Sequence, residues 1–224
     1  MFDLVFDDGN FVIADKPAGW LTVPSRFEAE DERTVLGREL EKSLNARLFP
    51  VHRLDFEVSG LVMFARNPRA HREAGQWFEK RQVTKTYQAL SAARDFSHWP
   101  PDLRRADEAI SVGEELEWRC RLLRGKRRSY EHAKGDLAVT RARLEGVDEG
   151  TWRWSLHPLT GRAHQLRFEM SRHGFPILGD ALYGSKAVWE DKAIALRAVH
   201  LDLSQAPGRR DWQLPESFQV KGLF

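Results

Sequence analysis

This chain has almost no cysteine and no long apolar run. Cys120 is the single cysteine among 224 residues, so an internal disulfide cannot form and a reducing compartment is expected. The first residues lack a basic stretch followed by an apolar one, and the longest apolar run spans only a few residues. We therefore expect a soluble, cytoplasmic protein without a signal peptide or a transmembrane helix.

Motifs of several enzyme classes are also missing. Cys120 has no partner at the spacing of metal ligands, and His52 and His164 each lack a second ligand nearby, so no metal is expected. Ser59 lacks the Gly-x-Ser-x-Gly setting of a nucleophilic serine, and no Gly-x-x-x-x-Gly-Lys loop is present. Serine hydrolases and P-loop nucleotide-binding proteins are thereby excluded.

A strong excess of one charge is absent too. The 35 Lys and Arg residues face 33 Asp and Glu residues, which leaves a net charge of +2, far from that of a generic polyanion binder. The cations are unevenly distributed, because the segment from Arg119 to Arg128 holds six of them and no acid. A solvated loop explains such a segment as well as phosphate binding does. The cations that we predict to contact phosphates are Arg124, Lys126, Arg127 and Arg128.

Apolar patterns predict an α+β protein dominated by antiparallel strands. Alternating apolar residues predict a hairpin of 2–6 and 11–14 and further strands at 60–66, 84–92, 114–123, 138–145, 151–157 and 193–203. Helical spacing predicts helices at 34–46 with Thr34 as N-cap, at 68–80 after Asn67, and at 162–173 before Gly174. The irregular segment 94–112 is the candidate boundary between two halves.

The most informative stretch is 51–66. It places one carboxylate, Asp55, directly after a His-Arg pair and before a glycine-punctuated apolar strand, which suits a reactive group at the mouth of a sheet. An ordinary turn or capping aspartate is the alternative. A nucleophilic carboxylate must be ionised, and a nearby guanidinium favours its charged form. Arg53 and Arg167, the latter in the run 160–167, are the candidate partners, although each could be an ordinary surface arginine.

Tyr87 lies in the strand predicted at 84–92. A tyrosine in a strand usually belongs to the core, with its hydroxyl satisfied at the edge, and the functional alternative is a ring on which a base stacks. The stretch 51–66 and the cations of the run 160–167 together point to chemistry on RNA.

Four ordered blocks over nearly the whole chain resemble the RluA-type RNA pseudouridine synthases. The first is the Lys-Pro-x-Gly turn at 16–19, and the second is the His-Arg-Leu-Asp run that ends in Ser-Gly, at 52–60. The third is the run 85–89, in which a basic residue lies two positions before a tyrosine and an alanine lies two positions after it. The fourth joins Gly-Arg-x-His-Gln-h-Arg at 161–167, where h is apolar, to Gly-x-Pro-Ile-Leu-Gly-Asp-x-x-Tyr-Gly at 174–184. A weaker match at 196–201 resembles the family's last core strand.

The resemblance implies a pseudouridine synthase fold, with a central, mainly antiparallel mixed sheet flanked by helices and loops. It implies one catalytic domain over 1–224 whose two sheet halves share a cleft, without a separate S4-type RNA-binding module. Asp55 would be the catalytic residue, Tyr87 an active-site residue and Arg167 the ion-pair partner of Asp55. The residues then expected to bind substrate are Arg53, His52, Leu166, Arg162, His164 and Gln165.

Three positions depart from the family pattern. Val58 stands where a threonine is common, Ala163 replaces the usual threonine of the fourth block, and Glu169 replaces a frequent histidine. None of these changes removes Asp55 or Arg167. Packing around the pocket and RNA preference are the properties that they would alter.

The implied reaction isomerises specific uridines to pseudouridine in structured ribosomal or transfer RNA, through attack by Asp55 on a flipped-out nucleotide. No cofactor is expected, and we expect a monomer with RNA as its partner and no membrane association. A non-catalytic RNA-binding or RNA-folding protein on the same scaffold is the alternative, but it would not need Asp55, Tyr87 and Arg167. A glycoside hydrolase would need a second positioned acid, and no spacing rule marks Glu57 as one.

Overall fold

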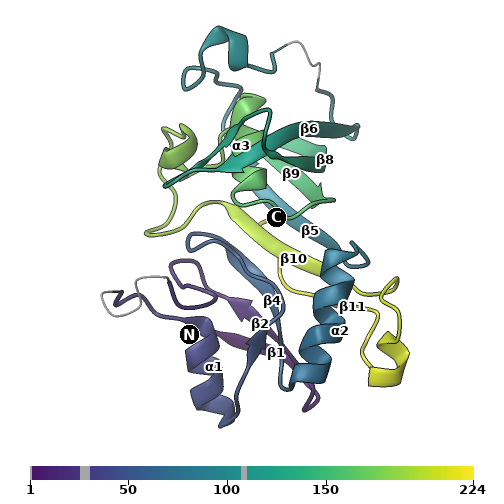
Figure 1. Cartoon of the computed structure of the whole chain (residues 1–224). Helices are drawn as coiled ribbons and strands as arrows, with labels where there is room; N and C mark the ends of the chain where they lie inside the picture. The colour runs from purple at the N-terminus through teal and green to yellow at the C-terminus, as the bar shows by residue number, and fades with distance from the viewer. Residues whose placement is uncertain (1, 26–30, 107–109) are drawn as a thin grey trace. The chain divides into compact units, whose positions relative to one another are not determined.

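The structure is a computed structural model that describes residues 2–25, 31–106 and 110–224. The chain divides into two compact units, and Figure 1 labels their elements. Unit 1 comprises Met1–Lys85, Asp191–Ala193 and Ala198–Lys221, and unit 2 comprises Thr86–Glu190, Ile194–Arg197 and Gly222–Phe224.

The predicted boundary at 94–112 is wrong. The chain passes from unit 1 to unit 2 between Lys85 and Thr86, within one continuous strand. The described part of the irregular segment belongs to unit 2, where the Arg94 side chain donates to the carbonyl of His173 at 3.2 Å. Residues 107–109 of that segment lie outside the described residues. The irregular sequence marks an excursion inside one unit, not a linker.

Unit 1 is built on a run of neighbouring strands. In sheet order these are β1 (Asp3–Asp7), β2 (Phe11–Lys16), β4 (Ser59–Ala65) and β10 (Leu196–Asp202), with β3 (Phe49–Pro50) paired to β4 and β11 (Ser217–Gln219) paired to β10. The last five residues of β10 belong to this unit. The predicted hairpin of β1 and β2 and the predicted strand β4 are confirmed. The two-residue β3 and three-residue β11 were not predicted, since neither is long enough to show an alternating pattern.

Two helices belong to unit 1. Helix α1 spans Leu36–Leu44 and α2 spans Pro68–Glu79. The predicted cap of α2 is confirmed, because the Asn67 side chain accepts from Ala70 N at 2.9 Å. The predicted cap Thr34 is wrong: its carbonyl accepts from Leu21 N at 2.9 Å, and the extended Val35 becomes the N-cap without a side-chain bond.

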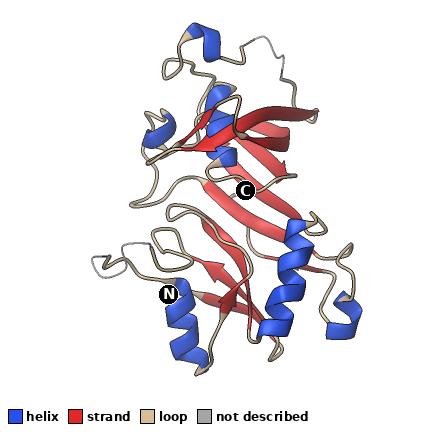
Figure 2. Cartoon of the chain, in the orientation of Figure 1, coloured by secondary structure: helices blue, strands red, loops and turns tan. Residues whose placement is uncertain are grey.

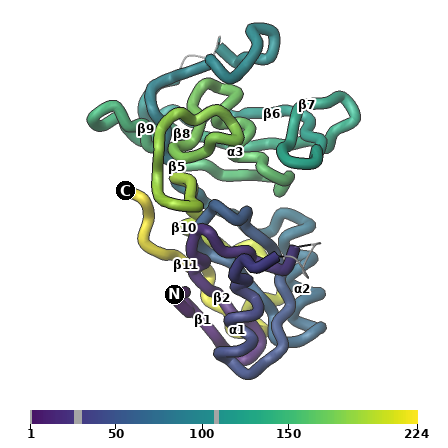
Figure 3. Tube along the Cα trace, turned by 90° about the vertical axis from the view of Figure 1, so that its left-hand side faces the viewer, coloured from purple at the N-terminus to yellow at the C-terminus, as the bar shows by residue number. Residues whose placement is uncertain are grey.

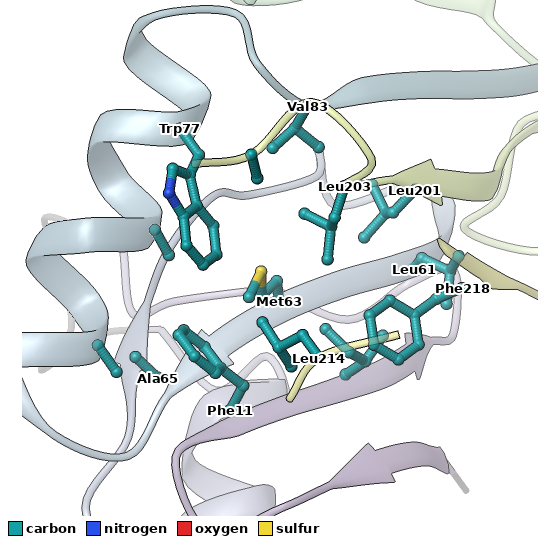
Figure 4. Packing of buried hydrophobic residues seen from close by; sticks show 14 residues of the cluster. Phe11, Leu61, Met63, Ala65, Trp77, Val83, Leu201, Leu203, Leu214 and Phe218 are labelled. Carbon is teal, nitrogen blue, oxygen red and sulfur yellow. The ribbon is translucent and has the colours of Figure 1, made fainter. Parts of the chain in front are cut away.

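The core of unit 1 lies between α2 and the sheet. Figure 4 shows the Trp77 ring of α2 above Met63 of β4 and near Phe11 of β2, with Leu214 beside them. Phe11 and Met63 are fully buried. The apolar helical stripe in the sequence therefore serves packing, and it fixes α2 to β2 and β4, the strands next to the turns of the first and second blocks.

Unit 2 has its own antiparallel strands. In order they are β5 (Thr84–Ser91), β9 (Thr151–Pro158), β8 (Asp136–Asp148), β6 (Glu115–Arg124) and β7 (Ser129–Glu131). Exposed and buried residues alternate along β6, as expected for a strand with one face on a core. The predicted strands β5, β6, β8 and β9 are confirmed, and β7 was not predicted.

Helix α3 spans Gln165–Arg172, and all eight of its residues are buried. It contacts β7, β8 and β9, and Figure 3 shows the tube of α3 next to these strands. The predicted start at 162 is wrong by three residues. Arg162 N donates to Gln165 Oε1 at 3.0 Å, which closes a turn, and His164 takes a left-handed backbone with φ 52° before the helix begins.

The predicted α+β class is confirmed. Figure 2 shows the helices and the strands of the described residues. The strand pairs β1–β2, β2–β4, β3–β4, β5–β9, β6–β7, β6–β8, β8–β9 and β10–β11 are antiparallel. Short 3-10 helices span Pro101–Leu103, Ala181–Tyr183 and Arg209–Trp212. No helix in the described part of the chain is long and apolar enough to span a membrane.

Candidate active site

Asp55 lies in the loop between β3 and β4, and both of its neighbours are tied down. The buried hydroxyl of Thr22 accepts from Leu54 N and donates to Leu54 O, each at 3.1 Å. On the other side, Gly19 N donates to the carbonyl of Phe56 at 2.9 Å. The half-buried carboxylate is thus carried by a backbone that is fixed at the residues before and after it.

Lys16 adds a third tie to this loop. Its fully buried ammonium donates to Pro17 O at 2.8 Å, to Trp20 O at 2.7 Å and to Phe56 O at 3.3 Å. Burial lowers the pKa of Lys16 to about 7, and the negative charge of Asp55 opposes this shift. Three carbonyl acceptors match the three donors of the charged form. The turn of the first block therefore holds the loop of the second one.

His52 and Arg53 have different environments. The half-buried imidazole of His52 stacks on Phe78 with ring centroids 4.6 Å apart, and its Nε2 accepts from Met63 N at 3.1 Å. Burial, aided by the charge of Lys85, lowers the pKa of His52 to about 3. His52 is thus a neutral group with a structural role, and its predicted substrate contact stays a prediction. Arg53 is exposed.

Tyr87 lies on β5 in unit 2, opposite Leu156 of β9, and is only 9% exposed. Its aromatic body is therefore held by the sheet. The alternation predicted for β5 places Ala89 on the same side of the strand, and this alanine is also buried.

Arg167 lies in the first turns of α3 and forms a buried ion pair within unit 2. Its Nε donates to Asp180 Oδ2 at 2.7 Å and its Nη2 to Asp180 Oδ1 at 2.8 Å, while both side chains are at most 2% exposed. The guanidinium also lies 5.5 Å from the centre of the Tyr183 ring. Paired hydrogen bonds of this kind fix the plane of the guanidinium.

The other residues predicted around Arg167 are divided between structural and accessible positions. The buried amide of Gln165 is used within the fold, since Oε1 accepts from Thr160 Oγ1 at 2.7 Å and Nε2 donates to Val139 O at 3.0 Å. Gln165 thus supports the loop before α3, and its predicted substrate contact stays a prediction. Arg162 Nε donates to Leu137 O at 3.0 Å and is half-buried, and Leu166 is 7% exposed.

The Tyr183 hydroxyl joins three segments of unit 2. It accepts from Ser129 N at 2.8 Å and lies 3.2 Å from His164 Nδ1. Ser129 Oγ in turn donates to Ala163 O at 2.6 Å. The short strand β7 is therefore fastened to the loop before α3 and to the 3-10 helix that follows Asp180.

Glu169, a departure from the family pattern, is buried in a local polar cluster. Its Oε1 accepts from Cys120 Sγ at 2.7 Å and its Oε2 lies 3.5 Å from His173 Nε2. Burial and the charge of Glu169 raise the pKa of the Cys120 thiol. This thiol is therefore no nucleophile, and among the described residues no group of three or more His, Cys, Asp or Glu side chains is arranged to hold a metal ion.

The C-terminal half of the basic segment, residues 124–128, comprises the end of β6 and the turn that leads to β7, and it is called the basic turn. Arg124, Lys126, Arg127 and Arg128 are all exposed there. Arg128 Nη1 lies 3.3 Å from His98 Nε2, and burial together with the charge of Arg128 lowers the pKa of His98.

The predicted catalytic set is distributed over both units. Asp55 belongs to unit 1, whereas Tyr87 and Arg167 belong to unit 2, so their meeting in one site stays a prediction. Sequence reasoning missed Asp180 and Thr22 as supporting residues. Asp180 is the one aspartate in the second part of the fourth block, so this motif could have indicated its supporting role. Thr22 lies in none of the four blocks, and nothing in the sequence marks it.

Comparisons with known proteins show the family to which the chain belongs. The family model described as RNA pseudouridylate synthase matches residues 10–172. Two similar relatives are the dual-specificity RNA pseudouridine synthases RluA of Pasteurella multocida and Escherichia coli strain K12. The first is 34% identical over 81% of this chain and 76% of its own length, and the second is 32% identical over 88% and 82%.

Two solved human structures share the fold. RNA Pseudouridylate Synthase Domain Containing 1 matches with a TM-score of 0.69 and 22% identity, over 98% of this chain and 82% of its own. Domain Containing 4 matches with a TM-score of 0.64 and 20% identity, over 89% and 83%. With the family model covering both the Asp55 loop and Arg167, this chain belongs to the RNA pseudouridylate synthases, the enzymes that isomerise uridine to pseudouridine in RNA.

Proposed function

We propose that this chain isomerises specific uridines in structured ribosomal or transfer RNA, with Asp55 as the nucleophile. The observation that carries the proposal is the fixation of the Asp55 loop by Thr22, Gly19 and Lys16, from the residue before Asp55 and the residue after it. A surface aspartate in an ordinary turn needs no such support, whereas a nucleophile gains rate from being held in one geometry.

The reaction begins with a uridine that leaves the base stack, at a cost of roughly a few kcal/mol that is least in loops. Asp55 attacks the nucleotide, at the sugar or at the base, and the bond between C1′ and N1 breaks. The uracil turns in the pocket and C5 bonds to C1′. The hydrogen on C5 leaves as a proton, N1 takes up a proton, and Asp55 is released unchanged. The atoms balance without an oxidant, a reductant or a group carrier, so we propose no cofactor.

Arg167 and Tyr87 complete the proposed catalytic set from unit 2. Arg167 would keep Asp55 ionised before attack and respond to its change of charge, an effect that is strong only where water is partly excluded. A guanidinium carries five donors, so the pairing of Arg167 with Asp180 is compatible with a second carboxylate. Asp180 is then a positioning residue that orients Arg167. Tyr87 would stack on the uracil.

The remaining contacts follow from exposure. Exposed Arg53 would fill the space that the flipped base leaves or hold a phosphate, and the half-buried His164 and Arg162 would line the approach to Arg167. Leu166 would supply apolar contact. We propose one catalytic domain formed by both units, acting as a monomer in the cytoplasm.

The test is tritium release from RNA labelled at uridine C5, because bond formation at C5 must expel that hydrogen. The RNA comes from cells that lack this protein, so that its target uridines are unmodified. We expect release with the wild type and none with Asp55→Asn, while thermal unfolding and RNA binding of the variant match the wild type. A fully active Asp55→Asn would overturn Asp55 as nucleophile, and no release from either protein would favour a binding role.

A further inference from the structure

The hairpin of β6 and β7 exposes one aromatic ring beside its basic turn. Tyr130 is 43% exposed, whereas the preceding Ser129 is 2% exposed. This alternation turns Ser129 toward the interior of unit 2 and Tyr130 toward solvent. In the ladder Tyr130 lies opposite Leu123 of β6. Tyr130 therefore presents an exposed aromatic ring on a hydrogen-bonded strand, onto which another flat ring can stack.

The basic turn supports the Tyr130 ring. A Cβ on Gly125 would come within 3.2 Å of that ring and within 2.8 Å of Arg128 O. Because glycine has no Cβ, the ring can pack directly against the backbone of Gly125. Gly125 N donates to Arg128 O at 3.0 Å, which closes the turn. The ring of His132 meets Tyr130 edge to face, with centroids 6.1 Å apart. Tyr130 is thus held from two sides and remains partly open to solvent.

The strand that carries Tyr130 is fixed to the residues around Arg167. Ser129 donates from its backbone to the Tyr183 hydroxyl at 2.8 Å and from its side chain to Ala163 O at 2.6 Å. Tyr183 is the residue whose ring lies under the Arg167 guanidinium. The position of Tyr130 relative to Arg167 is therefore set by short contacts within unit 2, and a nucleotide on Tyr130 would lie at a defined place relative to the catalytic arginine.

We propose that Tyr130 and the basic turn bind a single-stranded nucleotide next to the target uridine, with its base stacked on the Tyr130 ring. The neighbouring phosphates would contact Arg124, Lys126, Arg127 and Arg128. This inference rests on the proposed function and extends it to a substrate feature, because it requires unpaired RNA beside the target.

The chemistry selects this ligand over others. An aromatic face next to several cations suits an unpaired base with its phosphates, and the acid that follows the ring, Glu131, is paired with Arg172 at 2.8 Å. A paired base has its faces covered by its neighbours, and a free phosphate ion would make no use of the ring. The segment from Arg119 to Arg128 has no acid that would repel such a strand.

The experiment compares Tyr130→Ser and Tyr130→Phe with the wild type. The probes are a mixed-sequence RNA of about 12 nucleotides, a length within the range that one such binding surface covers, and the duplex of that RNA with its complement. The matched control is Phe224→Ser, since Phe224 is also 43% exposed in unit 2 and also lies near a cation, with the Arg153 guanidinium 5.8 Å from its ring.

We expect Tyr130→Ser to weaken binding of the single strand by roughly ten-fold or more, with duplex binding unchanged. Tyr130→Phe and Phe224→Ser should bind like the wild type, and thermal unfolding should show that all variants are folded. Equal loss for strand and duplex, or equal loss in Tyr130→Phe, would overturn base stacking. No loss in Tyr130→Ser would leave the ring as a surface for another partner, such as a protein.

Tritium release separates this inference from the proposed function. With RNA at saturating concentration, Tyr130→Ser should release tritium at the wild-type rate, while the RNA concentration needed for half of that rate rises. If the wild type releases no tritium but binds single strands through Tyr130, the proposed reaction fails and the binding site stands. If the wild type is active and Tyr130→Ser matches it at every RNA concentration, only the binding site fails.

Discussion

The pair of Arg167 and Asp180 is the most deeply buried charge pair near the proposed chemistry, with side chains 2% and 1% exposed. We predict that Asp180→Asn lowers the free energy of unfolding by about 3 kcal/mol, because the buried guanidinium then faces a neutral amide. Urea unfolding measures this change.

The matched control is Asp7→Asn in unit 1. Asp7 also accepts two contacts from one arginine, Arg66, at 2.8 and 2.7 Å, but these side chains are 18% and 23% exposed. Solvent screening should hold that loss to about 1 kcal/mol or less. If both variants lose the same free energy of unfolding, burial does not explain the contribution of the Asp180 pair to stability.

His52 makes stability depend on pH in one direction. Its pKa falls from the ordinary 6.5 to about 3 in the folded chain, so the unfolded chain binds more protons between these values. The stabilisation is complete above pH 6.5 and is lost as the pH falls toward 3, by up to about 1.4 kcal/mol for each unit.

The His52→Gln variant isolates this dependence. Glutamine can still accept from Met63 N, but it does not titrate. Denaturant unfolding from pH 7 to pH 5 should therefore show a shallower decline in the variant than in the wild type. If the free energy of unfolding falls equally in both proteins between pH 7 and pH 5, burial does not hold His52 neutral in the folded chain.

At the scale of elements, length decided what the sequence could predict. β4, β6 and α2 are long enough for their periodicity to show, and their predicted bounds lie within one or two residues of the observed ones. β7 has three residues and no alternation to read. It pairs because Ser129 is fastened to Tyr183, more than fifty positions along the chain, and such a tertiary contact leaves no local pattern.

Gly60 on β4 has a testable effect on its sheet. It has φ +114°, and a Cβ there would overlap the backbone of Ala198 on β10. We predict that Gly60→Ala costs about 3 to 5 kcal/mol, from backbone strain together with forced separation of the two strands.

Gly75 supplies the opposite case in the same unit. It lies in α2, and a Cβ there has no heavy atom within 4 Å. Gly75→Ala should therefore stabilise the chain by about 0.5 to 1 kcal/mol, because alanine loses less entropy in a helix. Thermal unfolding of both variants tests the contrast, and a Gly60→Ala as stable as Gly75→Ala would contradict it.

At the scale of the whole molecule, the sequence marks the proposed reacting groups more clearly than their supports. Asp55, Tyr87 and Arg167 follow from motifs, because each block joins a reactive residue to a recognisable neighbourhood. Thr22 lies 32 positions before Leu54, and only folding brings its hydroxyl to the Asp55 loop. The supporting role of the Gln165 amide was missed for the same reason: its partners Val139 and Thr140 are far away in the sequence.

The division into units predicts that binding and chemistry separate by mutation. The exposed cations of the β6–β7 turn belong to unit 2 and Asp55 belongs to unit 1. Replacing Arg127 and Arg128 by Ser should reduce the slope of log affinity against log salt by about 1.5, since each phosphate contact contributes about 0.7 to 0.9. The rate of tritium release at saturating RNA should stay unchanged in that variant.

Asp55→Asn should show the reverse, with the wild-type salt slope and no tritium release. The matched control replaces Lys42 and Arg47 by Ser, two exposed cations of unit 1 that lie outside the basic turn. This control should leave both the slope and the rate unchanged. A slope that falls equally in the control would mean that RNA affinity comes from the total charge of the chain, and the basic turn would then have no special place in holding the substrate.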